Sequence, residues 1–415
     1  MSSRLPEIER WLAELCGDEA ARFDFSTIAG GASPRKFHRL RPQHETAGTR
    51  ALFANRATAI VMEVPADTPD VAFARERGRG WPFLELRSLL ETRGVRVPCL
   101  LAEAGARGLL LVEDLGETLA DFLASHPSER ESLYALAVHD LARAQGALDP
   151  LPDDSVVRLR AFDATLLAFE IDHFREWALE ARGRFLDARE RATFDAARDF
   201  LVTTLTNLPR GFVHRDYQSR NLLVTHETRT GARELGWVDF QDALLGPRAY
   251  DLVALLCDSY QPFDRAFVER RLDEYVEVRG LSAEGRRALG REFDLITVQR
   301  KLKDAGRFVF IEKTKNDPSF LAYVDPTLGI VRQALARVSD VPELRELAKL
   351  LDALYPRVTA PGAARGRSDG PAPIRPRAPC RKRAPSFFRV NRRGERPTKR
   401  RRWRDRRDRV RNPRT

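Results

Sequence analysis

The chain has 415 residues, and its 71 Lys and Arg outnumber its 60 Asp and Glu, which gives a formal net charge of +11. Residues 356–415 hold 22 basic and four acidic side chains, a net charge of +18, so residues 1–355 carry −7. The overall charge is therefore poor evidence for a nucleic-acid-binding protein, because the larger part of the chain is mildly acidic. Four scattered cysteines without a CxxC pair argue against a disulfide framework and a cysteine-rich zinc site.

Two classes of segment that direct a protein to membranes are not expected. No apolar run approaches the ~20 residues that a membrane-spanning helix needs. The first residues, MSSRLPEIERWLAEL, carry charges where a secretion signal needs an apolar stretch. We therefore expect a soluble, cytoplasmic protein with no membrane partner.

The N-terminal part has the pattern of a small α+β lobe, in which one helix is set among several antiparallel strands. Hydrophobic periodicity and turn residues predict its elements. In chain order they are a helix over 5–16, a strand over 35–40 that closes a hairpin, a strand over 59–64, a helix over 81–93, and strands over 97–101 and 108–113.

Helical periodicity dominates after residue 116. The predicted helices cover 118–123, 132–148, 163–181 and 189–205, followed by a short β-rich segment near 211–240 and more helices to about residue 354. Beyond these, the Pro-, Gly- and Arg-rich residues have too few aliphatic side chains to offset the entropy of ordering, which predicts disorder. The expected division is an N-lobe at 1–115, a helical C-lobe at 116–355 and a basic tail at 356–415.

One segment of the β-rich part has the residue types for phosphoryl transfer. Its sequence GFVHRDYQSRN places Asp216 five residues before Asn221, and LGWVDF ends an apolar strand at Asp239. A hairpin that turns at about residue 230 would bring Asn221 opposite Asp239. An amide oxygen facing a carboxylate suits Mg²⁺, which prefers oxygen ligands, and Asp216 would lie beside that ion as a candidate base.

These motifs resemble the catalytic and metal-binding loops of protein-kinase-like phosphotransferases. The combination of HRDYQSRN and DFQDALLGPRAYDL looks closest to aminoglycoside-phosphotransferase-like small-molecule kinases. It is especially similar to bacterial anomeric kinases of N-acetylmuramate and N-acetylglucosamine, which serve cell-wall sugar recycling. The resemblance implies a two-lobed protein-kinase-like fold, ATP and Mg²⁺ as cofactors, Asp216 as the catalytic residue, Asn221 and Asp239 as metal ligands, and Asp251 as a brace for the catalytic loop.

The same resemblance assigns the nucleotide site. It implies phosphate binding by a glycine-rich turn and adenine binding by the hinge that follows residue 112. Met62 stands where the family usually has a phosphate-binding lysine, so a nearby basic residue would have to supply the charge. The implied nucleotide-binding residues are Gly30, Gly31, Ser33, Arg35, Lys36, Glu113 and Leu115.

The acceptor site is assigned by position and resemblance together. Glu170 and Trp177 share one helix face by their spacing, which fits either a half-buried structural helix or a platform for a sugar ring. Gln241 and Asp242 follow Asp239 directly and are candidate sugar contacts. Arg300 or Lys303 is a candidate partner for a lactyl carboxylate, although a charged helix face explains both almost as well.

Three alternatives remain open at this point. In the first, the acceptor is an aminoglycoside, choline or homoserine rather than an amino sugar. In the second, the protein is a catalytically silent, kinase-like binding protein, as the absent lysine suggests. The third is nucleic-acid binding by the tail, where RRRWR places an aromatic residue among arginines.

Overall fold

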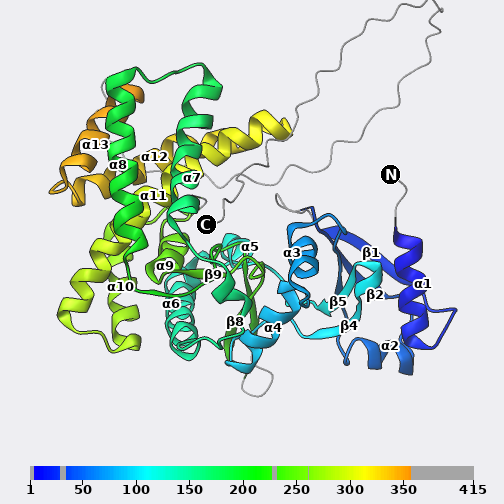
Figure 1. The fold of residues 1–415 in the computed structure, drawn as a ribbon. Coiled ribbons are helices and arrows are strands. Elements are labelled where there is room, and N and C mark those ends of the chain that lie inside the picture. The colour runs from blue at the N-terminus through cyan, green and yellow to red at the C-terminus, as the bar shows by residue number, and fades with distance from the viewer. Residues whose placement is uncertain (1–3, 29–33, 227–230, 260, 357–415) are drawn as a thin grey trace, which may run out of the picture. The chain divides into compact units, whose positions relative to one another are not determined.

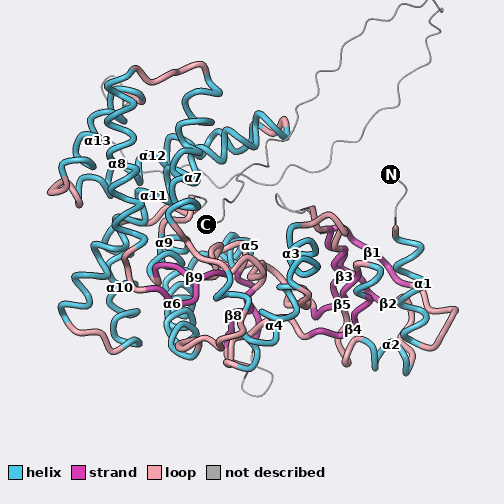
Figure 2. Tube along the Cα trace, viewed as in Figure 1, coloured by secondary structure: helices cyan, strands magenta, loops and turns pink. Residues whose placement is uncertain are grey.

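The structure is a computed structural model that describes residues 4–28, 34–226, 231–259 and 261–356. Its described elements have an α+β arrangement, with a β-rich part followed by a larger helical part (Figures 1 and 2). Residues 4–356 belong to one compact unit, and the predicted division of this unit after Leu115 stays a prediction. The predicted disordered tail lies outside the described residues, except for Pro356.

A five-stranded antiparallel sheet forms the β-rich part, in the order β1-β2-β3-β5-β4. Its strands are β1 (Phe23–Ile28), β2 (Lys36–Pro42), β3 (Ala59–Glu63), β4 (Leu100–Ala104) and β5 (Leu109–Glu113). The accompanying helices are α1 (Leu5–Cys16), α2 (Ala47–Leu52), α3 (Pro69–Arg77) and α4 (Pro82–Thr92).

Alternation along the strands gives this sheet two apolar faces. Val61 and Leu111 point to the face covered by α1, whereas Ile60 and Met62 point to the face covered by α4. The second face is continuous with the core of the helical part. Each fully buried side chain of this kind stabilises the fold by about 1.5–3 kcal/mol relative to an exposed one.

The strand predicted over 97–101 is wrong in its position, because β4 begins only at Leu100. Pro98 has no backbone N–H to give to a strand ladder. Its carbonyl oxygen instead accepts a hydrogen bond from Arg87 Nε (2.8 Å), and the Cys99 N–H donates to Glu113 Oε2 (3.1 Å). Side chains therefore hold the segment that the pattern assigned to the strand.

The larger part consists mainly of helices and contains two small hairpin-like strand pairs. Its helices are α5 (Leu119–Ser125), α6 (Arg130–Ala147), α7 (Ala164–His173), α8 (Ala188–Thr206), α9 (Ala249–Leu256), α10 (Arg265–Arg279), α11 (Ala283–Lys315), α12 (Val324–Arg337) and α13 (Pro342–Leu354). Its strand pairs are β6 (Arg210–Val213) with β9 (Leu244–Pro247), and β7 (Leu222–His226) with β8 (Arg233–Trp237). Among the described residues, no helix is both long and apolar enough to span a membrane.

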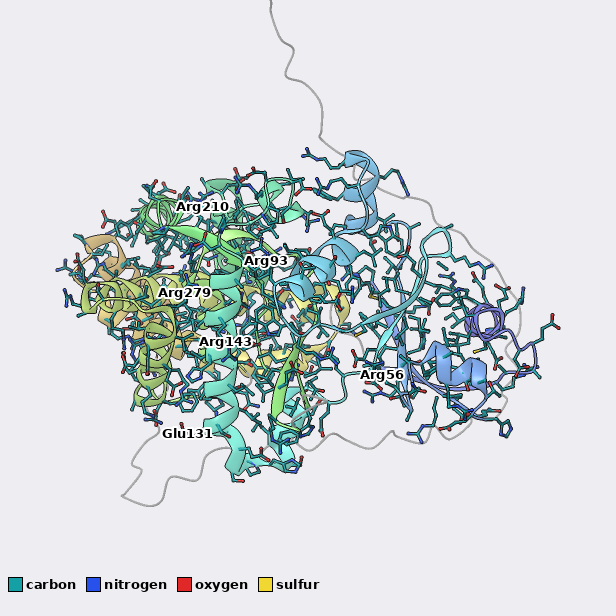
Figure 3. The ribbon with its side chains drawn as sticks, turned by 90° about the horizontal axis from the view of Figure 1, so that it is seen from below. Arg56, Arg93, Glu131, Arg143, Arg210 and Arg279 are labelled. Atoms are coloured by element: carbon teal, nitrogen blue, oxygen red, sulfur yellow. The ribbon has the colours of Figure 1, made fainter. Side chains whose placement is uncertain are left out.

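Helices α6 and α10 pack side by side and hold the start of α9; Arg143 and Arg279 mark the two helices in Figure 3. Tyr275 of α10 donates a hydrogen bond to Gln145 Oε1 of α6 (2.6 Å). The amide nitrogen of Gln145 in turn donates to the carbonyl oxygen of Arg248 (3.1 Å), directly before α9. This buried polar chain fixes the N-terminal end of α9, which carries a residue of the candidate site.

Helix α11 passes very close to the C-terminal end of α7. A Cβ atom at Gly306 would lie 2.4 Å from the carbonyl oxygen of His173, so only glycine permits this approach. At the same point α7 gives way to a π-helical segment, Phe174–Leu179. The predicted helix over 163–181 is thus interrupted where α11 crosses it.

Candidate active site

The loop between β6 and β7 is held by a buried carboxylate of α9. Asp251 accepts hydrogen bonds from the backbone N–H groups of His214 (2.7 Å) and Arg215 (3.0 Å). Burial raises the pKa of Asp251 to about 7, and the two N–H donors oppose part of this rise. These two hydrogen bonds hold the loop in place, which is the role that the resemblance implied for Asp251.

Arg215 adopts a backbone conformation that is uncommon for a residue other than glycine, with a φ of 80°. Two contacts hold it there. Its Nη2 donates to Glu170 Oε1 (3.1 Å), and its carbonyl oxygen accepts from Arg300 Nη1 (2.7 Å). Strain of this kind persists only where the surroundings determine the conformation, and here it sets the direction of the next residue, Asp216.

Asp216 presents its carboxylate to solvent while one oxygen is anchored. The side chain is 40% exposed, and Oδ1 accepts from Arg300 Nη2 at 3.3 Å. Partial burial opposes ionisation, but the charges of Arg300 and Lys303 outweigh it and lower the pKa of Asp216. The group is therefore an ionised, oriented acceptor that a substrate hydroxyl can reach.

The predicted pairing of Asn221 with Asp239 is wrong by one residue. The hairpin register pairs Leu222 with Trp237, which brings Asn221 level with Val238, whose N–H donates to the Asn221 carbonyl oxygen (3.1 Å). Asp239 follows the end of the strand and has a left-handed φ of 64°, so it leaves the ladder instead of continuing it.

Both side chains nevertheless lie beside Asp216. The Asn221 Nδ2 donates to the carbonyl oxygen of Asp216 (2.8 Å), which leaves the amide oxygen available as a ligand. Burial raises the pKa of Asp239, and the negative charge of Asp216 raises it further. Asp239 Oδ1 accepts from Gln241 Nε2 (2.8 Å), which also lies 3.4 Å from Asp242 Oδ2.

This donor set fits a magnesium ion that is held jointly with a nucleotide. Asn221 and Asp239 offer one amide oxygen and one carboxylate, and Mg²⁺ is usually bound by one or two such groups together with phosphate and water oxygens. Within the described ranges no three His, Cys, Asp or Glu side chains group as a protein-only metal site. The repulsion between Asp216 and Asp239 is what a bound cation would relieve.

The predicted nucleotide-binding residues before and in β2 differ in how far the structure describes and exposes them. Gly30, Gly31 and Ser33 lie outside the described residues. Arg35 is half-buried just before β2, and its charge acts on Asp239, whereas Lys36 is exposed.

Strand alternation explains why Arg35 and Lys36 differ. Phe37 pairs with Met62 and packs on the face shared with α4, while Leu40 packs on the α1 face. The odd-numbered residues of β2 therefore face the side of the sheet on which the catalytic loop lies, and the even-numbered residues face the opposite side. Lys36 belongs to the second set.

The hinge residues Glu113 and Leu115 have different roles in the structure. The Glu113 carboxylate is bound by Arg56 (2.9 Å) and Arg96 (2.6 Å), and its N–H donates to the Cys99 carbonyl oxygen (2.9 Å). Burial raises the pKa of Glu113, but its hydrogen bonds, led by that of Arg96, lower it to about 2. No hydrogen bond joins the backbone of Leu115 to another described residue, so this backbone remains available to a ligand.

The predicted acceptor residues do not all gather at Asp216. Arg300 contacts Asp216, whereas Gln241 contacts Asp239 and Asp242 instead. Glu170 is only 3% exposed, and besides Arg215 its carboxylate accepts from Gln299 (2.9 Å), so it lies behind the catalytic loop. The indole of Trp177, in the π-helical segment, packs edge-on against Phe310 (4.8 Å between ring centroids).

Two buried residues that contact Glu170 had not been predicted as site residues from the sequence. Gln299 and Tyr250 both bond to Glu170, Tyr250 through its hydroxyl at 3.5 Å. The ring of Tyr250 also lies 4.8 Å from the Arg300 guanidinium. Their sequence signal was their direct adjacency to Arg300 and Asp251, two residues that had been singled out.

The sequence profile of the phosphotransferase enzyme family matches residues 24–289. An N-acetylmuramate/N-acetylglucosamine kinase of Pseudomonas aeruginosa is 31% identical over 360 residues, which cover 85% of this chain and 94% of that protein. A protein of the same name from Neisseria meningitidis is 28% identical, with 82% of this chain and 94% of that protein covered.

Solved structures show a similar fold. The GDP complex of wild-type aminoglycoside 2'-phosphotransferase-IIIa superposes with a TM-score of 0.51 at 14% identity, covering 81% of this chain and 99% of that one. A choline kinase from Cryptosporidium parvum gives a TM-score of 0.52 at 11% identity, covering 79% and 92%. These likenesses confirm the expected two-lobed, protein-kinase-like fold class.

Proposed function

This chain belongs to the phosphotransferase enzyme family, and we propose that it is an ATP-dependent kinase that phosphorylates the anomeric hydroxyl of N-acetylmuramate, N-acetylglucosamine or both. The observation that carries this proposal is the solvent-facing carboxylate of Asp216, anchored by Arg300 beside the Asn221–Asp239 pair. The choice of acceptor is supported by the names of relatives that match most of the chain.

In the proposed mechanism, Asp216 receives the sugar hydroxyl and orients it toward the terminal phosphate of ATP. Phosphoryl transfer depends mainly on in-line positioning and on charge stabilisation, so the fixed geometry of this carboxylate matters more than its basicity. The lowered pKa of Asp216 agrees with such an orienting role. As bonding to phosphorus develops, the hydroxyl proton passes to an oxygen of Asp216.

Asn221 and Asp239 would hold the magnesium ion that accompanies ATP. When bound, the ion neutralises charge on the phosphate oxygens. Gln241 restrains one oxygen of Asp239, while the Asn221 amide is oriented by its bond to the Asp216 backbone. The chain thereby links the metal ligands mechanically to the catalytic residue.

Arg35 supplies the positive charge that Met62 cannot. Met62 is 3% exposed and belongs to the apolar core. Arg35, in contrast, lies just before β2, and its charge acts on Asp239. At the hinge, the backbone of Leu115, which bonds to no other described residue, would meet the adenine edge, and Glu113 would stabilise the hinge through its ion pairs.

The substrate proposal predicts that purified full-length protein with Mg-ATP converts at least one of the two sugars to its 1-phosphate. NMR of the reaction mixture identifies the product by the phosphorus coupling of its anomeric proton. Gentamicin, choline and homoserine serve as comparison acceptors. Turnover of a comparison acceptor with neither amino sugar consumed would replace the proposed substrate, and no turnover at all would favour a silent binding protein.

The phosphate-binding proposal predicts that Arg35→Ala raises KM for ATP about tenfold or more, the usual effect of losing a hydrogen bond to a charged group. Lys36→Ala is the matched control, because it removes the same charge one residue further on, where the side chain faces away. We expect it to change KM by less than about twofold. Equal effects of the two substitutions, measured by steady-state kinetics, would contradict the assignment to Arg35.

A further inference from the structure

Helix α11 presents a row of cations that begins at the catalytic residue. Arg300, Lys303 and Arg307 are spaced three and four residues apart, so they lie along one side of the helix. Arg300 contacts Asp216, and the charge of Lys303 also acts on it. The row therefore leads away from the place where the acceptor hydroxyl would be held.

Arg300 positions the catalytic loop through both of its terminal nitrogens. It is 3% exposed, and its two terminal nitrogens donate to the Arg215 carbonyl oxygen and to Asp216. Its guanidinium plane lies 4.8 Å from the ring centre of Tyr250. A buried cation with these partners is a positioning residue, and it has little capacity left for an anionic part of the substrate.

Lys303 is different, because its ammonium group shares its neighbouring carboxylate, that of Asp304, with Lys301. Its contacts are the Tyr250 hydroxyl (3.4 Å) and Asp304 Oδ1 (3.7 Å), and the charge of Glu170 also acts on it. The carboxylate of Asp304 is already engaged by Lys301 at 2.9 Å. An ammonium group has three donors, and the side chain is still 17% exposed, so it can bind an additional anion.

The charge of Lys303 acts on the imidazole of His173, which belongs to a cluster of aromatic rings. The His173 ring lies 5.5 Å from Phe310 and 6.0 Å from Trp177. Burial, together with the charges of Arg307 and Lys303, lowers the pKa of His173 to about 4, so this imidazole is neutral and adds no competing charge. Flat aromatic rings of this kind offer apolar area to a pyranose.

We propose that Lys303 binds a carboxylate on the acceptor sugar and thereby makes the enzyme favour N-acetylmuramate over N-acetylglucosamine. The two sugars differ in the 3-O-lactyl group, whose carboxylate only N-acetylmuramate carries. Tyr250 separates Lys303 from Arg300, and Arg300 touches Asp216, so the ammonium lies one side chain away from the reacting hydroxyl. The inference rests on the proposed function and specifies its substrate.

The test compares the two sugars as substrates of the full chain and its variants under Mg-ATP. For Lys303→Met we expect the ratio of kcat/KM for N-acetylmuramate to that for N-acetylglucosamine to fall about tenfold, because a charge-assisted contact is lost for one sugar only. With the wild-type enzyme, kcat/KM for the methyl ester of N-acetylmuramate should be lower than that for the free acid by a similar factor. With Lys303→Met, esterification should lower kcat/KM little further. Lys303→Arg should restore most of the ratio, since it retains the charge.

Lys313→Met is the matched control, because Lys313 lies on the same helix and is exposed, with a side-chain exposure of 44%. It should leave the ratio as it is in the wild type. A Lys303→Met variant that loses activity equally on both sugars would overturn the proposal and show that Lys303 acts on Asp216 instead of on the substrate. Wild-type protein that phosphorylates neither sugar would overturn the proposed function itself, and this inference with it.

Discussion

Replacing Asp216 by asparagine is expected to lower kcat by about 10²- to 10⁴-fold on whichever amino sugar is the substrate. The carboxylate is the solvent-facing group to which the acceptor hydroxyl is proposed to donate, and an amide cannot accept its proton. An asparagine can still accept a hydrogen bond from Arg300 through its oxygen, so the loop should keep its conformation. Binding of a non-hydrolysable ATP analogue, measured by calorimetry, should change by less than about threefold.

A suitable control for this experiment is Asp199→Asn on α8, whose side chain is 67% exposed and pairs with Arg198. It removes the same charge, so kcat should stay at the wild-type value. Equal activity of wild type and Asp216→Asn would show that the chemistry lies elsewhere. A silent binding protein, in contrast, would show no turnover even before the substitution.

The second large effect is expected for Asp239→Asn. Its carboxylate is the one charged ligand proposed for the metal, so we expect turnover to fall by about 10²-fold or more, equivalent to several kcal/mol of transition-state stabilisation. Added Mg²⁺ should restore only part of the activity, because the remaining amide oxygens bind the ion weakly. The measurement is kcat as a function of Mg²⁺ concentration.

Stability gives an independent test of the same substitution. Burial and the charge of Asp216 disfavour ionised Asp239 in the free protein, as its raised pKa shows. Without nucleotide and metal, Asp239→Asn should therefore melt at the wild-type temperature or slightly above it. Mg-ATP should raise the melting temperature of the wild type clearly more than that of the variant. A variant that is destabilised before any ligand is added would indicate a structural role for Asp239 instead.

The sequence allowed the fold class to be predicted, together with the proximity of Asp216, Asn221 and Asp239, because both depend on local patterns. The spacing from Asp216 to Asn221 and the strand before Asp239 are fixed by one loop and one hairpin. The exact pairing was wrong by one residue, since every pair of the ladder, from His226–Arg233 to Leu222–Trp237, is offset by one residue from a hairpin symmetric about residue 230. Such an offset has no simple signature in residue type.

The roles of residues on opposing helices were harder to predict. Periodicity correctly indicated that Glu170 and Arg300 lie on particular faces of their helices, but not what each face meets. In the structure both contact Arg215, one through its side chain and the other through its carbonyl oxygen. Tertiary packing therefore connects them to the catalytic loop, a relation that no spacing within either helix contains.

The close crossing of α7 and α11 at Gly306 bears on the order in which substrates bind. Backbones in direct contact leave no space for one helix to slide past the other, so the side chains of Lys303 and His173 keep their separation. Movement between open and closed forms would then fall to the hinge near Leu115, where Arg39 pairs with Asp114. The side chains proposed to hold the sugar would then be in place before nucleotide arrives, which permits either substrate to bind first.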